Sequence, residues 1–476
     1  MSIRIAALIL VVLFFSGYAW KNWFVSACVS VLLLAAVQHP DFPAKMGGIQ
    51  GLNPWNFLIL NVFLSWLRNR GEEGLIWDMP SGVQWLLIGY IIIIVVGVVR
   101  WIPQSDEEFP LGSIISEDII NTLKWILPGL ILFDGCRTRE RMLIALMTIL
   151  GLYLLLAVQV VRWMPLSSAT GSGADFATRA SKIIQNEIGY NRVTLSNVLA
   201  GASWAALVFT IVVNTQWQRL MVLGAAGIIA LGQSLTGGRT GYVTWGFVGL
   251  VLSLMRWRKL LPIIPIVVVA LGIALPGIRE RMLQGFVSNS GNIVQKTDEY
   301  EVTSGRNIAW PAVIEEIKKS PLFGYGKEAM VSTGIRDQLM SQYGESFPHP
   351  HQAYLEILLD NGVLGFLIII PFYLAVLWRS FQLVLVREDP LVCAVGCTAF
   401  ALVLALMVGA MGGQTFYPRE GAVGMWAAIG LMLRVSMEWN RYREQDSQFF
   451  GVGEEEQWRI LESDAGHAHS ASELRC

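Results

Sequence analysis

Three arginines and two histidines interrupt an otherwise apolar sequence. Arg192 lies in NRVTLSNVLAG, Arg239 in SLTGGRTGY and Arg306 in SGRNIAW. His349 and His351 lie in SFPHPHQAYLEILLDNGVLG, directly before a hydrophobic run. Guanidinium groups bind phosphate oxygens through paired hydrogen bonds and keep their charge, and a neutral imidazole can accept a proton. Together these residue types could bind a diphosphate and activate a hydroxyl nucleophile.

Each of these residues also has a simpler interpretation. An arginine at the edge of an apolar span can reach toward lipid phosphate, and a histidine can simply cap a helix. Three glycines flank Arg239, and they favour a binding role because they let the backbone approach a ligand closely. His351 opens a hydrophobic run, where the helix macrodipole disfavours imidazolium, so we expect it to be neutral near pH 7. Of the two histidines, His349 fits the simpler role of capping a helix or lying at the aqueous interface better.

The elements that must position these residues are expected to be membrane-spanning helices. The chain has 476 residues, of which 54% are hydrophobic and 15% charged, and its mean hydropathy is +0.51. A soluble globular chain carries roughly 25% charged residues. The net charge of −1 argues against a nucleic-acid partner. The five cysteines show no disulfide-like spacing, and no cluster of metal ligands stands out. We therefore predict an all-α, polytopic bundle in a lipid bilayer.

Thirteen apolar stretches are candidates for spanning helices, each of which needs about 20 residues with a range of roughly 17 to 25. One of the first three could be re-entrant, so we expect 12 or 13 transmembrane helices. The N-terminus lacks a small-x-small cleavage site and is interpreted as a retained first span. The candidates are 3–20, 22–38, 54–67, 82–102, 119–134, 141–163, 191–213, 218–235, 240–255, 259–275, 353–378, 390–411 and 420–436.

Basic residues in the connections predict the orientation. Counting spans back from the C-terminus puts every basic connection on one side, the cytoplasm by the positive-inside rule. These connections are 136–142, 216–220, 255–260, 376–388 and the segment after the last span. The long loops 164–190 and 276–352 and all the arginines and histidines named above then face the periplasm. Residues 1–437 would form the transmembrane domain, and 438–476 a charged, flexible cytoplasmic tail.

The 276–352 loop has a pattern of its own. Apolar residues at 308, 309, 312, 313 and 317 recur at helical spacing and lead to SPLFGYG. This spacing predicts an amphipathic helix at the membrane surface that caps a cavity between spans. Four charged loop residues could orient acceptor sugars or simply face solvent. They are Glu328, Arg336, Asp337 and Glu345.

Three stretches resemble the O-antigen ligase and polymerase family of bacterial polytopic membrane enzymes. They are SGRNIAW followed by SPLFGYG, the run HQAYLEILLDNGVLG, and the turn SLTGGRTGY with spans on both sides. The resemblance covers roughly the second half of the chain. It implies transfer of a glycan from a polyprenyl (undecaprenyl) diphosphate carrier to a hydroxyl acceptor, without a metal or other cofactor. The reaction would take place at the periplasmic face of the inner membrane.

The resemblance also assigns roles to individual residues. The family's histidine falls on His351 and its arginines on Arg239 and Arg306, while Arg192 is placed by its position before an N-x-x-A-like stretch. Gln352 stands where the family usually has Asn or Ser, and its longer amide keeps both donor and acceptor capacity. The neighbouring imidazole leaves open which histidine is the base. Supporting candidates are His349, Gln352 and Tyr354.

Two enzymatic versions and one transport function remain open at this point. A ligase passes the glycan to a lipid A–core or another final acceptor in lipopolysaccharide biosynthesis, and a polymerase passes it to another lipid-linked repeat unit of a polysaccharide. In either version, a single displacement would invert the anomeric configuration. A transporter of lipid-linked oligosaccharide should show internal repeats with interrupted helices in matching positions. The sequence shows no such repeat, and the 276–352 loop has no counterpart in the first half.

Overall fold

Apolar runs of this chain fold into helices, the conformation that satisfies backbone hydrogen bonds within one segment. The computed structural model describes residues 3–43, 53–104, 109–284, 303, 305–344, 346–413 and 416–445. Within these ranges the structure is all-helical and contains no strand, as the sequence predicted. Most of the expected tail, and Glu345, lie outside the described residues.

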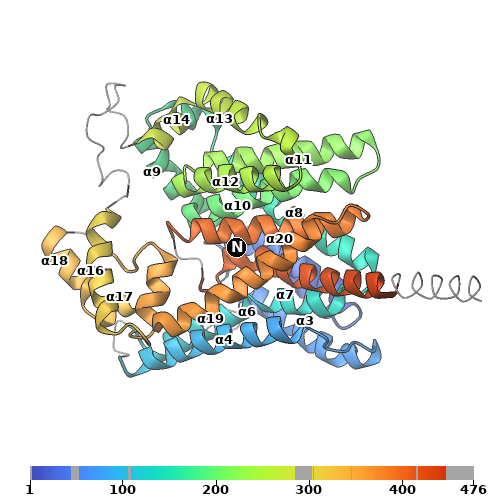
Figure 1. Cartoon of the computed structure of the whole chain (residues 1–476), viewed down its shortest axis with the longest axis horizontal. Coiled ribbons are helices and arrows are strands. Elements are labelled where there is room, and N and C mark those ends of the chain that lie inside the picture. Colours follow the sequence, from blue (N-terminus) through green and yellow to red (C-terminus); the bar gives the residue numbers. More distant parts are fainter. Residues whose placement is uncertain are drawn as a thin grey trace, which may run out of the picture.

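In Figure 1, α10, α11 and α12 lie together in the upper part of the bundle, and α3 and α4 lie at the bottom. The bounds of the helices of the first half are α1 Ile3–Tyr18, α2 Trp23–Val37, α3 Pro54–Glu72, α4 Ser81–Trp101, α5 Leu111–Ser113, η2 Ile114–Ile120, α6 Asn121–Lys124, α7 Leu127–Gly135, α8 Arg139–Trp163, α9 Gly173–Ile183, η4 Ile184–Ile188, α10 Arg192–Val208 and α11 Gln216–Leu235. Those of the second half are α12 Arg239–Met255, α13 Ile263–Ala274, α14 Pro276–Leu283, α16 Arg306–Lys319, α17 Ala329–Ser332, α18 Ile335–Tyr343, α19 Ala353–Val384 and α20 Pro390–Gly409. A last helix covers 423–445.

Every predicted apolar stretch falls on helical structure, but the helices differ in length. By length and hydropathy, six described helices could each cross a membrane: α4, α8, α10, α11, α19 and α20. α13 has only 12 residues, and the chain bends by 113° between it and α14, so the stretch 259–275 spans only if both helices count as one. The stretch 119–134 is likewise broken between α6 and α7. A count of 12 or 13 spans stays a prediction.

Hydrogen bonds and ion pairs join several of the Lys- and Arg-rich connections between helices at one end of the bundle. Arg139 forms an ion pair with Asp389, and Arg256 donates to the carbonyl of Val384 at 2.6 Å. In Figure 1, α16, α17 and α18 lie at the left end, whereas helix 423–445 leaves at the right. The structure thus places the 306–343 part of the long loop and the C-terminal helix at opposite ends of the bundle, and the side of the membrane that each faces stays a prediction.

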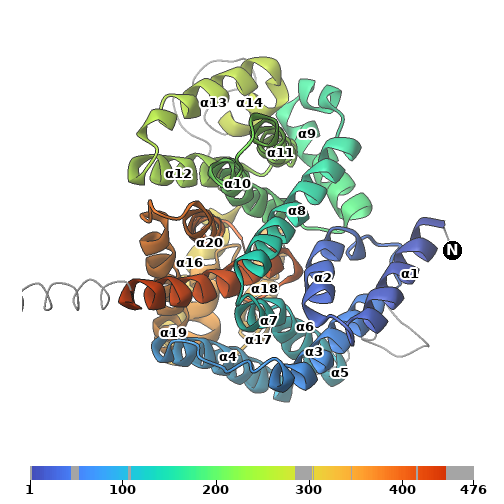
Figure 2. The same cartoon turned by 90° about the vertical axis from the view of Figure 1, so that its right-hand side faces the viewer.

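Asp78 ties the same end of the bundle together. Its carboxylate accepts hydrogen bonds from Arg434 at 2.6 Å, from Arg441 at 2.6 Å and from Arg137 at 3.3 Å. The Arg434 side chain is completely buried, so its charge depends on these partners. The network joins the α3–α4 connection to the α7–α8 connection and to helix 423–445. Figure 2 views the bundle from this side, with helix 423–445 near its middle.

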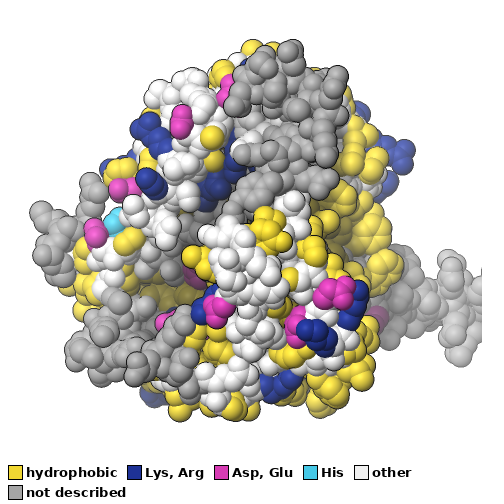
Figure 3. Space-filling view, turned by 90° about the vertical axis from the view of Figure 1, so that its left-hand side faces the viewer, with side chains coloured by type: hydrophobic (Ala, Val, Ile, Leu, Met, Phe, Trp, Pro, Cys, Tyr) yellow, Lys and Arg dark blue, Asp and Glu magenta, His cyan; other side chains and the backbone are white. Residues whose placement is uncertain are grey.

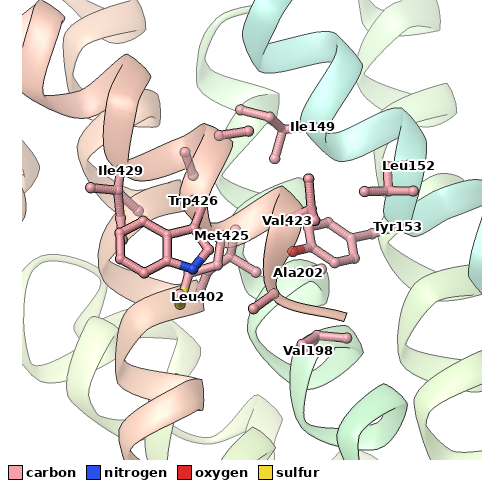
Figure 4. Packing of buried hydrophobic residues seen from close by; sticks show 14 of the residues in the cluster. Ile149, Leu152, Tyr153, Val198, Ala202, Leu402, Val423, Met425, Trp426 and Ile429 are labelled. Carbon is pink, nitrogen blue, oxygen red and sulfur yellow. The ribbon is translucent and has the colours of Figure 1, made fainter. Parts of the chain in front are cut away.

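The core lies where helix 423–445 crosses α7 and α8. Tyr153 of α8 and Trp426 of the last helix are both buried there, among aliphatic side chains of α10 and α20 (Figure 4). Gly129 and Gly430 face each other so closely that a Cβ on either residue would overlap the backbone of the opposite helix. Small residues of this kind let membrane helices approach. The four described cysteines are buried and free, as expected of small core residues.

The predicted amphipathic helix of the long loop is α16, and it has a small core of its own. Ala309 and Val313 are buried, and Ile308, Ala312 and Ile317 pack against the same cluster. The helical spacing in the sequence is therefore confirmed at all five positions. The rest of this cluster comes from α17, α18, Tyr325, Phe347 and the first half of α19. This packing fixes α16 beside the segment that carries both histidines.

α19 is interrupted at Gly362, which the sequence did not predict. Gly362 has φ +63° and ψ −167°, which breaks the helical hydrogen bonding. The SPLFGYG turn fills the break: the N–H of Val363 donates to Pro321 at 2.8 Å, and the N–H of Tyr325 donates to Leu359 at 2.9 Å. A Cβ at residue 362 would overlap the Leu322 carbonyl. The loop turn and the broken helix thus form one interlocked unit.

Candidate functional site

The turn between α11 and α12 gathers guanidinium groups around one backbone carbonyl. Gly237 has φ +68°, a left-handed conformation that favours glycine. Its carbonyl accepts a hydrogen bond from Arg192 Nη1 at 3.2 Å and another from Arg281 Nε at 3.4 Å. Arg192 begins α10, whose first N–H groups are capped by the Asn191 side chain. Arg281 belongs to α14, so three separate elements meet at this turn.

Arg239 completes this cluster from the first position of α12. Its Nη1 donates to the backbone carbonyl of Gln284 at 3.4 Å, directly after α14. Arg239 and Arg281 both act electrostatically on Arg192. Three like charges held this close repel one another, and a bound polyanion would relieve that repulsion.

A cavity of about 460 Å³ opens beside this cluster, and we call it the arginine cavity. Arg192, Arg281 and Gln284 line one side. The other side is α9, which contributes Lys182 and small residues. The cavity therefore combines three cations with a polar amide, a lining that suits an anion such as a diphosphate. Figure 3 faces this end of the molecule, where Lys and Arg side chains gather in the upper half of the face.

The sequence analysis missed Arg281. A signal was available, because Arg281 lies in PGIRERML at the start of the predicted outer loop, directly after an apolar stretch. Arg279 is in the same segment, however, and the sequence gives no reason to prefer one over the other. α14 decides between them by exposing Arg279 and turning Arg281 toward Gly237.

Arg306 lies at the start of α16, and it reaches the start of α12 through Gly412. Its Nη2 donates to the carbonyl of Gly412 at 2.9 Å. Gly412 packs so tightly on Thr240 that a Cβ there would overlap the Thr240 methyl group. Burial lowers the pKa of Arg306, although a guanidinium stays protonated in proteins. Within the described part of the chain, Arg306 Nε and Thr240 Oγ1 are buried without hydrogen-bond partners.

The two histidines form a closely packed pair next to Arg306. Their ring centroids are 4.0 Å apart. The backbone N–H of His351 donates to Nδ1 of His349 at 3.2 Å, and Trp310 of α16 donates to the carbonyl of Pro350 at 3.0 Å. His351 has φ +53°, a conformation that is strained for a residue with a Cβ and is found mainly at functional sites. Contacts from α16 thus hold the histidine segment in place.

Burial and neighbouring cations keep both imidazoles neutral. Burial, followed by the charge of Arg306, lowers the pKa of His351 to about 4. Burial also holds the pKa of His349 far below its usual value, with further contributions from His351, Arg419, Lys327 and Arg306. We expected a neutral His351 for another reason, the helix macrodipole. α19 begins only at Ala353, so burial and Arg306 have the larger effect.

The supporting candidates occupy different environments. Gln352 is the N-cap residue of α19, but its side chain caps nothing, and its Oε1 is buried without a partner among the described residues. Tyr354 points away, since its hydroxyl donates to the carbonyl of Met407 at 2.8 Å and its ring packs on Phe416. Tyr354 therefore supports the start of α19 and does not line the group of cations.

Three of the four loop charges lie in the described part of the chain, and they form separate pairs. Asp337 is 74% exposed and pairs with Arg336, whereas Glu328 pairs with the buried Lys327 at 2.6 Å. Among the described residues, no three His, Cys, Asp or Glu side chains come together as metal ligands. Independence from metal stays a prediction.

A comparison with known protein families covers most of the arginines and both histidines of the site. Residues 224–370 match the family model described as O-Antigen ligase. This segment is similar to O-antigen ligases. It contains Arg239, Arg281, Arg306 and both histidines, whereas Arg192 precedes it. A search of curated proteins finds no match to the chain. The resemblance inferred from the three motifs is confirmed over the O-antigen ligase segment.

Proposed function

We propose that the protein is a membrane glycosyltransferase of the O-antigen ligase type that takes its glycan from a polyprenyl diphosphate. The observation that supports this most directly is the juxtaposition of cations and a neutral base. Arg239 and Thr240 are consecutive, and they link the arginine cavity to Arg306 and thereby to His351. The match to O-antigen ligases over this same segment supports the same reaction.

The arginines would bind the diphosphate and stabilise its departure. As the bond between the anomeric carbon and the diphosphate oxygen breaks, its electron pair moves to the leaving group, where Arg192, Arg239 and Arg281 can neutralise the new charge. Arg306 lies between this cluster and the base, close to the point at which the bond breaks. The polyprenyl tail would lie among the apolar helices.

His351 is the better candidate for the base, for a reason that the sequence could not supply. A neutral imidazole has a single acceptor nitrogen. In His349 that nitrogen is Nδ1, which accepts the backbone N–H of His351, so His349 can offer only a donor. His351 would take the proton of the acceptor hydroxyl while its oxygen attacks the anomeric carbon. This single displacement inverts the anomeric configuration.

The orientation in the membrane belongs to the same proposal. The basic connections joined by Asp389 and Asp78 would face the cytoplasm, together with the C-terminus. The arginine cavity and the histidines would then face the periplasm of a bacterial inner membrane. Donor and acceptor would meet there at the depth of the lipid headgroups.

The test is an in vitro transfer assay with a polyprenyl-diphosphate glycan in the presence of EDTA. Wild type is compared with His351→Ala, Arg239→Ala and the exposed control Glu315→Gln. Turnover that persists in EDTA and is lost in the first two variants, with folding intact, is the expected result. Full activity of His351→Ala would remove the proposed base and redirect attention to His349. Product length then separates a ligase, which transfers one finished chain, from a polymerase.

A further inference from the structure

A second cavity of about 460 Å³ lies away from the arginine cavity, and we call it the polar cavity. Its charged lining is balanced, with three carboxylates and three cations. They are Glu117, Asp118 and Glu420, and Lys124, Lys327 and Arg419. The two cavities share no lining residue. A site without net charge has little attraction for a diphosphate, so its ligand has a different chemistry.

The polar cavity lies near the histidine segment, because Tyr354, three residues after His351, packs its ring on Phe416, next to the lining residue Tyr417. Lys327 and Arg419, which line it, both act electrostatically on His349. Arg306, at the edge of the arginine cluster, acts on both histidines. The imidazoles thus lie within reach of the cations of both groups. This is the arrangement that a two-substrate reaction needs, since each substrate must reach the base from its own site.

Aromatic rings form the apolar part of the polar cavity. Trp55 and Trp125 line it with ring centroids 5.0 Å apart, and Lys124 lies 4.3 Å from the Trp125 ring. Tyr417 adds a third ring. Aromatic faces offer packing area to the C–H groups of a ligand while nearby polar groups bind its hydroxyls. This combination suits a sugar ring better than a lipid tail.

Free acceptor groups point to the same ligand. Among the hydrogen bonds of the described residues, none ends on the carboxylates of Asp118 or Glu420, both of which line the cavity. Asp118 belongs to η2, a π-helical segment of the kind often found at functional sites. Ionised carboxylates form strong hydrogen bonds with hydroxyl donors. Several hydroxyls on one ring could satisfy both carboxylates at once.

One wall of the polar cavity is rigid before any ligand binds. Lys327 is buried, pairs with Glu328 at 2.6 Å and lies 4.6 Å from the centroid of Tyr417. The Tyr417 hydroxyl donates to Asp360 at 2.7 Å, just before the break in α19. Groups held in this way lose little freedom on binding. The interlocked SPLFGYG turn therefore supports this wall of the polar cavity.

We propose that the polar cavity binds the uncharged sugar ring of the acceptor and presents its hydroxyl to the histidine pair. This inference rests on the proposed glycosyl transfer. It specifies the acceptor side of the reaction, with Asp118 and Glu420 as hydroxyl acceptors. The arginine cavity remains the site of the donor diphosphate.

The test measures acceptor binding to the full chain in nanodiscs, with excess undecaprenyl diphosphate to fill the donor site. Two acceptor probes, neither carrying a diphosphate, separate the possible sources of the sugar. One is a lipid A–core glycolipid, and the other is a free repeat-unit oligosaccharide. Asp118→Asn and Glu420→Gln keep the shape of the side chains, and Glu315→Gln, on the exposed face of α16, is the matched control.

Each cavity variant should weaken binding of at least one probe by about tenfold, as expected for the loss of a charged hydrogen bond. Binding of undecaprenyl diphosphate should stay unchanged, and Glu315→Gln should bind like wild type. The inference is overturned if acceptor binding is unaffected, if undecaprenyl diphosphate binding falls equally, or if wild type binds neither probe. Intact acceptor binding without any transfer would instead count against the catalytic proposal.

Discussion

His349 and His351 have the same side chain but different freedom. The backbone fixes His349 through its Nδ1, while His351 has a left-handed backbone, is half-buried and feels the charge of Arg306. The sequence placed both histidines near a helix start but could not distinguish them. Their difference depends on one left-handed residue and one short hydrogen-bonded turn, and neither feature has a periodic signal.

The lowered pKa of His351 predicts an unusual pH profile for transfer. The base must be neutral, and it is neutral above its pKa of about 4. Activity should therefore stay nearly constant from pH 8 to pH 5.5 and decrease only as the pH approaches about 4. The measurement is the initial rate of transfer across this range at saturating donor. A decrease centred near pH 6.5 would show that the imidazole is solvated in the working enzyme.

Arg281 carries the next prediction. Arg281→Ala should reduce transfer by about 100-fold, because it removes one guanidinium from the cluster that receives the leaving charge. Arg281→Lys should restore only part of the rate, because an ammonium lacks the planar fork. Arg279→Ala, an exposed arginine on the same helix, is the control and should behave like wild type. Equal effects at positions 279 and 281 would mean that the overall charge of α14 matters, and not the contact with Gly237.

At the scale of the element, α19 should depend on Gly362. Gly362→Ala places a Cβ against the Leu322 carbonyl and forces a left-handed φ on alanine. We expect a loss of about 1–3 kcal/mol in the free energy of unfolding. Gly224→Ala is the matched control, since Gly224 lies in regular helix with open space around it. Thermal unfolding in detergent measures both variants, and equal midpoints would contradict the interlocked arrangement.

Helices were predictable from the sequence where apolar periodicity was strong, and the site was predictable only in part. Arg239, Arg306 and His351 stood out because charges are rare in apolar surroundings. The break in α19 was not predictable, because LLDNGVLG reads as a continuous helix with a tolerated glycine. The polar cavity combines residues near 38 and 54 with residues of 117–125, Lys327 and 417–420, and no local pattern connects positions so far apart.

At the scale of the molecule, the Asp78 network should govern stability. Asp78→Asn removes the charge shared by Arg137, Arg434 and Arg441 and should cost about 3 kcal/mol, since Arg434 is fully buried. Glu388→Gln, an exposed carboxylate at the same end, should change nothing. Denaturant unfolding followed by tryptophan fluorescence would measure the difference. An unchanged midpoint would show that packing at Gly129 and Gly430 suffices to hold the last helix.

The same network predicts how acid affects stability. Burial tends to raise the pKa of Asp78, but hydrogen bonds from Arg434 and Arg441 lower it well below its usual value. The carboxylate therefore stabilises the fold above the pKa of the unfolded chain, and this contribution is lost as the pH falls below about 4. Asp78→Asn should lack this component, so its stability should change less between pH 5 and pH 3 than that of wild type.

The interlock between SPLFGYG and the broken helix has a consequence for building hybrid enzymes. Residues 320–327 close hydrogen bonds that residues 359–364 leave open, so neither segment is complete alone. A hybrid enzyme that takes residues 306–343 from one parent and α19 from another would combine a turn and a broken helix that do not fit each other. Functional recombination should instead cut before 306 and after 364. Exchange of residues 306–364 between related enzymes would then transfer His351, Arg306 and the Lys327 wall of the polar cavity together.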